Sequence, residues 1–169
     1  MVAAVVLAAG ASTRFGSPKQ RLLLAPVLER VRASRAADDV VVVLGAHDVE
    51  TNARTVRCAE WERGPGASLR CGLAALPAAV EAAVVVLADG PELDPRSIDR
   101  VVSAWRERGG DVLAATYGGQ RSHPVLVARE AWARVPDEGF RYVAADAVPC
   151  DDLGAPGDVD TPGDLPQSF

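Results

Sequence analysis

Four short apolar runs constrain the fold of this 169-residue chain more than any other feature. They are rich in valine and do not alternate with polar residues, which is typical of strands covered on both faces. The runs comprise residues 2–7, 40–44, 82–88 and 112–115. Apolar side chains at helical spacing lie between and after them, over residues 27–37, 67–80 and 95–108. Strands that alternate with helices predict a mostly parallel sheet covered by helices. We therefore expect a Rossmann-like α/β protein, a three-layer α/β/α sandwich in which residues 1–169 form a single domain.

The composition excludes several classes of protein. A net charge of −5 argues against binding to nucleic acid, which requires a basic surface. No apolar stretch approaches the roughly 20 residues of a membrane span, and no basic residue precedes the apolar N-terminal run, as one would in a signal peptide. Cys58, Cys71 and Cys150 show neither metal-binding spacing nor an obvious disulfide framework. We therefore expect a cytoplasmic protein, without a membrane partner, whose cysteines are reduced and buried.

The loop after the first apolar run has the composition of an anion-binding site. Gly10 and Gly16 allow the backbone to turn its N–H groups towards an anion without obstruction by a Cβ atom. Arg14 and Lys19 add positive charge, and Lys19 is the only lysine among 18 basic residues. A helix that begins after the loop would add its positive end. The spacing matches neither the Walker nor the dinucleotide pattern. The loop is thus a candidate phosphate site, or an ordinary glycine-rich turn.

Acidic residues in two later segments are candidate metal ligands. Asp89 follows the buried run at residues 82–88, where a carboxylate is well placed to hold Mg²⁺ beside phosphates. The sequence Asp-Gly-Pro at this point is also a common turn. Asp158 and Asp160 alternate along the chain, so both project the same way if the segment is extended. Either one can complete a metal site with Asp89, while Asp160-Thr161-Pro162 is also a candidate helix cap.

The anion-binding loop carries a long and specific resemblance to a known family. Residues 7–19 resemble the signature LAAGxSxRxG followed by PK of the MobA-like nucleotidyltransferases. This family includes the molybdenum-cofactor guanylyl- and cytidylyltransferases. The resemblance implies that the nucleotide is bound by residues of this loop, which are Leu7, Ala8, Ala9, Gly10, Ser12, Arg14 and Lys19.

Further segments resemble motifs of the same family in the same order. Residues 62–73 resemble GMASSLRxGL, which implies that Ser68 and Arg70 face the nucleotide from a helix start. Residues 84–91 resemble LADQP, with Gly90 in place of glutamine, and residues 158–165 resemble DIDTPEDL. The stretches at residues 121–126 and 137–141 resemble GHP-V and GDxGxR, which implies acceptor contacts from His123 and Arg141. Without that context, a histidine before proline is usually a loop residue.

The resemblance implies a Mg²⁺-dependent nucleotidyltransferase. Such an enzyme transfers CMP or GMP from CTP or GTP to a phosphorylated acceptor, here a pterin of the molybdenum-cofactor type, and releases pyrophosphate. We expect Arg14, Lys19 and Asp89 to be catalytic, with Mg²⁺ on Asp89 and Asp160, and a molybdoenzyme or its chaperone as a protein partner. Two alternatives are an inactive nucleotide- or partner-binding domain, suggested by Gly90 and by a shortened segment after Lys19, and a sugar-1-phosphate nucleotidyltransferase.

Overall fold

The computed structural model describes residues 1–169 and contains one mixed, mostly parallel sheet of seven strands. The strands are β1 (Val2–Ala8), β2 (Asp39–Leu44), β3 (Arg54–Arg57), β4 (Ala82–Leu87), β5 (Val112–Tyr117), β6 (Gln120–Ala128) and β7 (Asp146–Pro149). The longer helices are α1 (Gln20–Ala33), α2 (Pro65–Ala74) and α3 (Pro95–Arg108). Short 3₁₀ turns complete the chain, at η1 (Trp61–Arg63), η2 (Arg129–Arg134), η3 (Asp151–Leu153) and η4 (Pro162–Asp164).

The strand order places the segments after β1 and β4 next to each other. The order across the sheet is β3-β2-β1-β4-β6-β5-β7, and β1 is parallel to both of its neighbours. Leu7 lies opposite Leu87 in the β1–β4 pair, so the two strands end at the same edge. Only β6 runs against its neighbours, β4 and β5. Ligands of open α/β sheets bind outside the carboxyl ends of the strands, and both predicted ligand-binding segments lie there.

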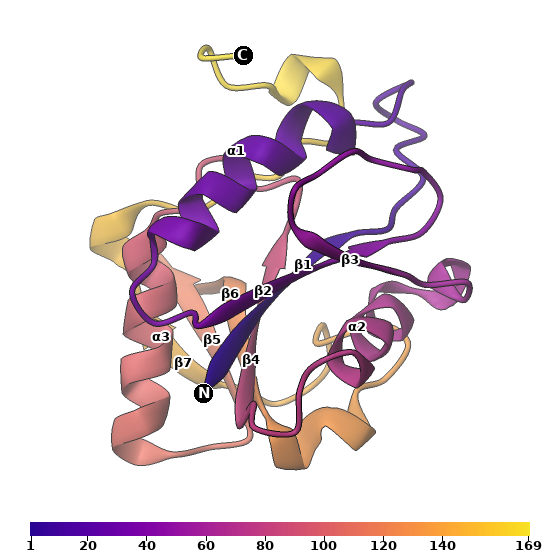
Figure 1. The fold of residues 1–169 in the computed structure, drawn as a ribbon. Coiled ribbons are helices and arrows are strands. Elements are labelled where there is room, and N and C mark those ends of the chain that lie inside the picture. Colours follow the sequence, from indigo (N-terminus) through magenta and orange to yellow (C-terminus); the bar gives the residue numbers. More distant parts are fainter.

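Helices cover both faces of the sheet, as the sequence predicts (Figure 1). One core contains α1 and α3 side chains packed on alternate residues of β1, such as Val6. The other core contains α2 and η2 side chains packed on the intervening residues, such as Val5. Because β1 is buried on both faces, its apolar residues need not alternate with polar ones. The protein is a three-layer α/β/α sandwich.

The first helix begins seven residues before the predicted start at residue 27. Helix α1 starts at Gln20, directly after Lys19, and continues through Pro26. Interior proline costs a helix about 3 kcal/mol or more. That cost is offset because the buried face of the helix gains about 1.5–3 kcal/mol for each large apolar side chain. The buried apolar residues of this face are Leu23, Leu24, Val27, Leu28 and Val31.

Three strands have no counterpart among the predicted elements. β3 and β7 are edge strands, which contact one neighbour and therefore need no continuous apolar run. β6 starts with exposed polar residues and becomes buried only from Pro124 onwards. Its presence also explains why His123 lies in a strand and not in a loop. The helix predicted to extend to residue 80 ends at Ala74.

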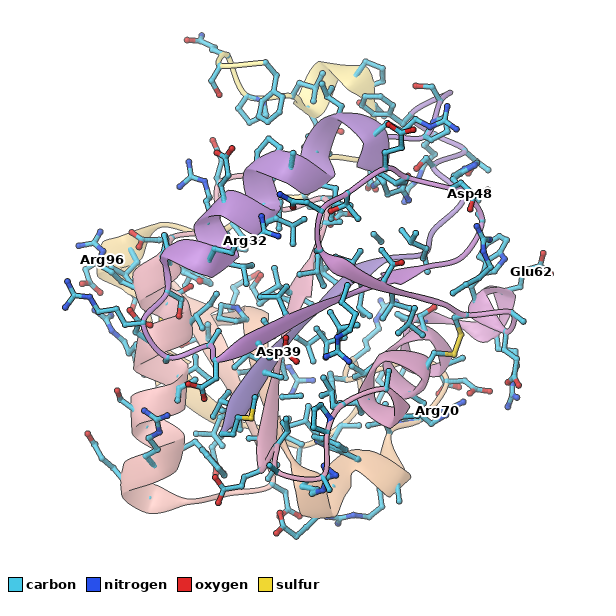
Figure 2. All side chains as sticks on the ribbon, viewed as in Figure 1. Arg32, Asp39, Asp48, Glu62, Arg70 and Arg96 are labelled. Carbon is cyan, nitrogen blue, oxygen red and sulfur yellow. A yellow bond between two sulfur atoms is a disulfide. The ribbon has the colours of Figure 1, made fainter.

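The expectation of three reduced cysteines is wrong for one pair. Cys58 follows β3 and Cys71 lies on α2, and the structure joins them in a disulfide with a Cα–Cα distance of 5.7 Å. This bond is visible as the yellow link beside α2 (Figure 2). The contact arises from the packing of α2 against the end of β3, which the 13-residue spacing does not indicate. Cys150 is free and buried, as expected. None of the helices is long and apolar enough to cross a bilayer.

Candidate active site

A cavity of about 330 Å³ opens where β1 and β4 end. The loop between β1 and α1 forms one wall, and the residues after β4 and before η4 form the opposite wall. Lys19, Asp89 and Asp160 all line it, so the cation of the loop and the predicted metal ligands share one cavity. Leu7 and Ala8 at the end of β1 also line it, together with the loop residues Gly10, Ala11, Ser12, Thr13 and Arg14.

The conformation of the loop between β1 and α1 is stabilised by Gln20, which belongs to none of the sequence motifs. Gln20 is the first residue of α1 and is almost fully buried. Its Nε2 donates to Gly10 O at 2.8 Å, and its Oε1 accepts from Ser12 Oγ at 2.9 Å. Ser12 Oγ also accepts from Lys19 N at 3.3 Å. Because the apolar pattern indicates a helix only from residue 27, it carries no signal for Gln20.

Two residues of the loop adopt left-handed backbone conformations. Gly16 has a φ of +83°, and Ser12 has a φ of +56°, which is uncommon for a residue with a side chain. Gly10, by contrast, has a negative φ, although nothing lies within 4 Å of the position that a Cβ atom would take. The open space beside Gly10 leaves room for a ligand to approach the backbone. Glycine therefore serves close approach at one position and chain reversal at the other.

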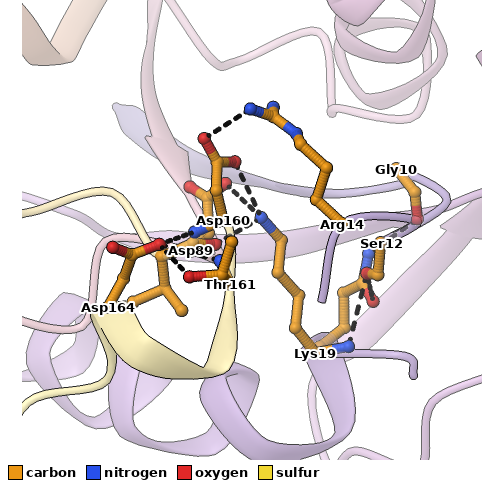
Figure 3. Close-up of polar contacts among 10 residues, drawn as sticks. Gly10, Ser12, Arg14, Lys19, Asp89, Asp160, Thr161 and Asp164 are labelled. Carbon is orange, nitrogen blue, oxygen red and sulfur yellow. Dashed lines mark hydrogen bonds and ion pairs between the residues drawn. The ribbon is translucent and has the colours of Figure 1, made fainter. Parts of the chain in front are cut away.

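Lys19 reaches across the cavity to the acidic wall (Figure 3). Its Nζ donates to Asp89 Oδ2 at 3.0 Å and to Val159 O at 2.6 Å, and Asp160 Oδ1 lies 3.7 Å away. Arg14 Nη1 lies 3.0 Å from Asp160 Oδ2. The two cations that the sequence assigns to phosphate thus neutralise the carboxylates that it assigns to a metal.

The acidic wall fits a cation that prefers oxygen ligands. Asp89, Asp158 and Asp160 each offer a carboxylate oxygen, and these oxygens lie within 4.8 Å of one another. Asp89 Oδ1 is buried and has no hydrogen-bond partner, so one ligand position remains unsatisfied. Burial and the neighbouring carboxylates of Asp89 and Asp160 raise the pKa of Asp158. Divalent cations such as Mg²⁺ relieve this repulsion by binding carboxylate oxygens.

The C-terminal segment is fixed against the end of β4. Val159 is buried, and its N–H donates to Asp89 O at 3.0 Å. The following turn η4 starts with a capping box, in which Thr161 and Asp164 exchange hydrogen bonds. Thr161 is therefore the cap residue of this turn, which leaves Asp160 facing the cavity. Both roles that the sequence suggests for this segment are present, on neighbouring residues.

A second cavity, of about 530 Å³, adjoins the first. Leu7 lines both cavities, and the second is bounded by Asp158 from the acidic wall. His123 of β6 and Arg141 of the turn at residues 136–143 also line it, although they are far apart in sequence. Its floor consists mainly of apolar side chains, including Leu69, Leu87, Leu93, Val125 and Phe140.

Substitution of His123 by glutamine tests the burial of the imidazole. Burial lowers the pKa of His123 from 6.5 to about 4, so the folded protein keeps the ring neutral where the unfolded chain binds a proton. Above pH 6.5 the ring is neutral in both states, so its burial does not reduce the free energy of unfolding. As the pH falls towards 4, only the unfolded chain binds the proton, and the free energy of unfolding falls. We expect wild type to lose on the order of 3 kcal/mol more than His123→Gln over this interval. Urea unfolding at a series of pH values measures the difference, and parallel curves would contradict the assignment.

Ser68 and Arg70 do not line the first cavity. Ser68 is a buried residue of α2. Arg70 donates through Nη1 to Val135 O at 2.7 Å and pairs with Asp137. The structure thus brings the loop, Lys19, Asp89 and Asp160 together in the first cavity. It brings His123 and Arg141 together in the second cavity. Arg70 lines neither of them and contacts the turn at residues 136–143.

The sequence profile of the MobA-like NTP transferase domain matches residues 4–139. The chain belongs to this family. The matched residues include the loop, Lys19 and Asp89 of the first cavity and the turn at residues 136–143 as far as Gly139. Membership places this MobA-like domain in a family of NTP-dependent nucleotidyltransferases, and it has the fold of the nucleotide-diphospho-sugar transferases.

Known proteins similar to this MobA-like domain include longer chains and single domains. The bifunctional protein GlmU of Sorangium cellulosum (strain So ce56) is 32% identical over an alignment 154 residues long, and this alignment covers 78% of this chain and 32% of that protein. GlmU of Mycolicibacterium gilvum (strain PYR-GCK) is 35% identical over an alignment 135 residues long, which covers 68% of this chain and 27% of that protein. The chain thus spans less than a third of either relative.

Solved structures match almost the whole chain. The Mycobacterium tuberculosis Rv0371c homologue from Mycobacterium sp. strain JC1 superposes with a TM-score of 0.79 and 26% identity, covering 96% of this chain and 92% of that one. A manganese complex of Rv0371c from Mycobacterium tuberculosis H37Rv gives a TM-score of 0.74 at 23% identity, covering 96% and 95%. The molybdopterin-guanine dinucleotide biosynthesis protein A of Archaeoglobus fulgidus shares the fold, with a TM-score of 0.70 at 17% identity over 97% and 94%.

Proposed function

We propose that the domain transfers CMP or GMP from CTP or GTP to a phosphorylated acceptor, a pterin of the molybdenum-cofactor type, and releases pyrophosphate. The observation that supports this most is the contact of Lys19 with Asp89 inside one cavity, next to a second cavity of a different character. The first cavity offers cations and free backbone to a triphosphate. The second offers apolar side chains to a larger acceptor.

The residues of the first cavity have separate tasks in this proposal. Arg14 and Lys19 bind the triphosphate together with the loop backbone, since a helix start and left-handed residues favour anions. Asp89 and Asp160 would hold a magnesium ion, which would supply positive charge to offset that of the phosphates and of the departing pyrophosphate. Transfer of this kind depends mainly on positioning and on charge stabilisation. A phosphate acceptor is already ionised at neutral pH, so the acceptor needs no general base.

The second cavity favours a bulky acceptor over a sugar phosphate. A sugar exposes hydroxyl groups on every side, and burying them without hydrogen-bond partners is costly. Eight of the lining residues are apolar, and Arg121 is occupied by backbone carbonyls of Phe140 and Val143. Arg141 at the rim is exposed, which suits the charged phosphate of an acceptor whose flat ring packs its faces on these side chains and keeps its polar edge towards the polar lining residues.

Pyrophosphate release tests the proposal. The domain is incubated with Mg²⁺, each of the four NTPs in turn, and either molybdopterin or a set of sugar 1-phosphates. We expect release with CTP or GTP and molybdopterin. Release only with a sugar 1-phosphate would show that the acceptor is a sugar phosphate and not a pterin. Nucleotide binding without release under any condition would favour an inactive binding domain. The predicted protein partner is tested by asking whether a molybdoenzyme or its chaperone takes up the product of this reaction.

Gln20→Met tests the support of the loop. The substitution preserves side-chain volume but removes the hydrogen bonds to Gly10 O and Ser12 Oγ. Because the loop then samples other conformations, we expect CTP or GTP to bind about tenfold more weakly, the scale of two hydrogen bonds. Calorimetry with Mg²⁺ measures the affinity. Gln120→Met, at the exposed start of β6, is the control, and equal affinities in both variants would exclude this role of Gln20.

A further inference from the structure

A single carboxylate joins the start of α2 to the turn that walls the second cavity. Asp137 accepts from Arg70 through Oδ1 and from Arg63 Nη2 through Oδ2, the latter at 3.1 Å. Its backbone O accepts from Gly66 N at 2.8 Å, within the first turn of the helix. Arg70 also donates to Val135 O at 2.7 Å. Arg70 therefore contacts this segment at two successive points.

The backbones of α2 and of the turn approach so closely that only glycine fits. A Cβ atom on Gly66 would lie 1.6 Å from Pro136 O, and one on Gly64 would lie 2.3 Å from Asp137 O. Gly64 also has a φ of +131°, which residues with a side chain rarely adopt. The glycines of this segment therefore serve the docking of the turn at residues 136–143.

The turn has no regular structure of its own to keep it in place. Its internal backbone bonds are few, and they include Gly139 N to Pro136 O and Val143 N to Phe140 O. At its far end, Arg121 donates to the backbone oxygens of Phe140 and Val143. The position of this turn thus depends on arginines of other elements, with Arg70 and Arg63 at one end and Arg121 at the other.

The same turn supplies a wall of the second cavity through Glu138, Gly139, Phe140 and Arg141. We infer that Arg70 is a positioning residue for the acceptor, which holds the turn in place through Asp137 and Val135, and that it is not a ligand of the nucleotide. This inference rests on the proposed function in one respect, namely that the second cavity takes the acceptor. Arg70 beside Asp137 lowers the pKa of that carboxyl, so the carboxyl is ionised at neutral pH.

The test measures hydrogen–deuterium exchange in the turn and, separately, the binding of the nucleotide and the KM for the acceptor. Arg70→Met and Asp137→Asn are compared with Arg54→Met, which removes a guanidinium that contacts the other end of α2 at Ala75 O. Hydrogen–deuterium exchange follows residues 136–143, calorimetry with Mn²⁺ gives the affinities for CTP and GTP, and pyrophosphate release gives the KM for molybdopterin. Should Arg70→Met fail to fold, Asp137→Asn provides the same readings.

In Arg70→Met we expect exchange in the turn to accelerate about tenfold and the KM for molybdopterin to rise about tenfold, the scale of one charge-assisted hydrogen bond. The nucleotide affinity should stay within about twofold of wild type, and Arg54→Met should change none of these values. A tenfold loss of nucleotide affinity with unchanged exchange would overturn the inference. If wild type itself does not use molybdopterin, the proposed function fails for that acceptor, while exchange and nucleotide affinity still decide the role of Arg70.

Discussion

Lys19→Met is expected to lower the rate of nucleotidyl transfer about 10²-fold or more, the cost of removing one preorganised charge from a transition state. Methionine retains the aliphatic stem that lies in the cavity wall, so the effect reports the ammonium group. Pyrophosphate release at saturating CTP or GTP measures it. Arg32→Met, which removes a cation from the exposed side of the same helix, should retain the wild-type rate.

The same variant has a second expected result, which follows from the contacts of Lys19 with the acidic wall. Its ammonium group neutralises Asp89 and Asp160, and so competes with any divalent cation for these carboxylates. Mn²⁺ alone should therefore bind more tightly to Lys19→Met than to wild type, by about tenfold. Water-proton relaxation measures this affinity without nucleotide. A near-normal transfer rate together with unchanged Mn²⁺ binding would remove Lys19 from the site.

Asp89→Asn is expected to have an effect of similar size through the metal. Asparagine keeps the shape of the side chain but removes the negative charge, and the unpartnered Oδ1 is the atom best placed to bind a cation. We expect Mn²⁺ to bind at least about tenfold more weakly and transfer to slow about 10²-fold or more. Wild type treated with EDTA should lose the same activity and regain it with Mg²⁺.

The control for this variant is a carboxylate outside the site. Asp111 pairs with Arg134 at 2.6 Å on the surface, and both side chains are exposed. Asp111→Asn should leave the transfer rate and Mn²⁺ binding unchanged, since exposed ion pairs contribute little. Equal behaviour of the two variants would show that Asp89 has no special part in metal binding.

The sequence predicts those parts of the fold that obey strong local rules. α3 extends from Pro95 to Arg108 as predicted, because Asp94 caps its start, proline suits the first turn, and Gly109 ends it. The proximity of Lys19 and Asp89 was likewise predictable, since β1 and β4 are parallel neighbours whose carboxyl ends meet at one edge. The resemblance to the motifs of the MobA-like nucleotidyltransferases then implied the roles of these two residues in nucleotidyl transfer.

Features set by packing between distant segments were not predictable. Gln20 supports the loop only because α1 begins seven residues earlier than the pattern indicates, and these about two extra turns are stabilised by burial against the sheet. The antiparallel β6, which carries His123, mixes polar and apolar halves and shows no strand periodicity. The pairing of Arg70 with Asp137 and that of Cys58 with Cys71 depend on how α2 meets the loops around it.

The most direct test of the central claim is calorimetric titration of CTP and GTP into the wild-type domain, with Mg²⁺ and again with EDTA. If the loop and the acidic wall bind one metal–nucleotide complex together, one of the two nucleotides should bind at a single site, with an affinity at least about tenfold higher in the presence of Mg²⁺. This dependence should disappear in Asp89→Asn. Equal affinities with and without the metal, or binding that is insensitive to both Lys19 and Asp89, would contradict the claim.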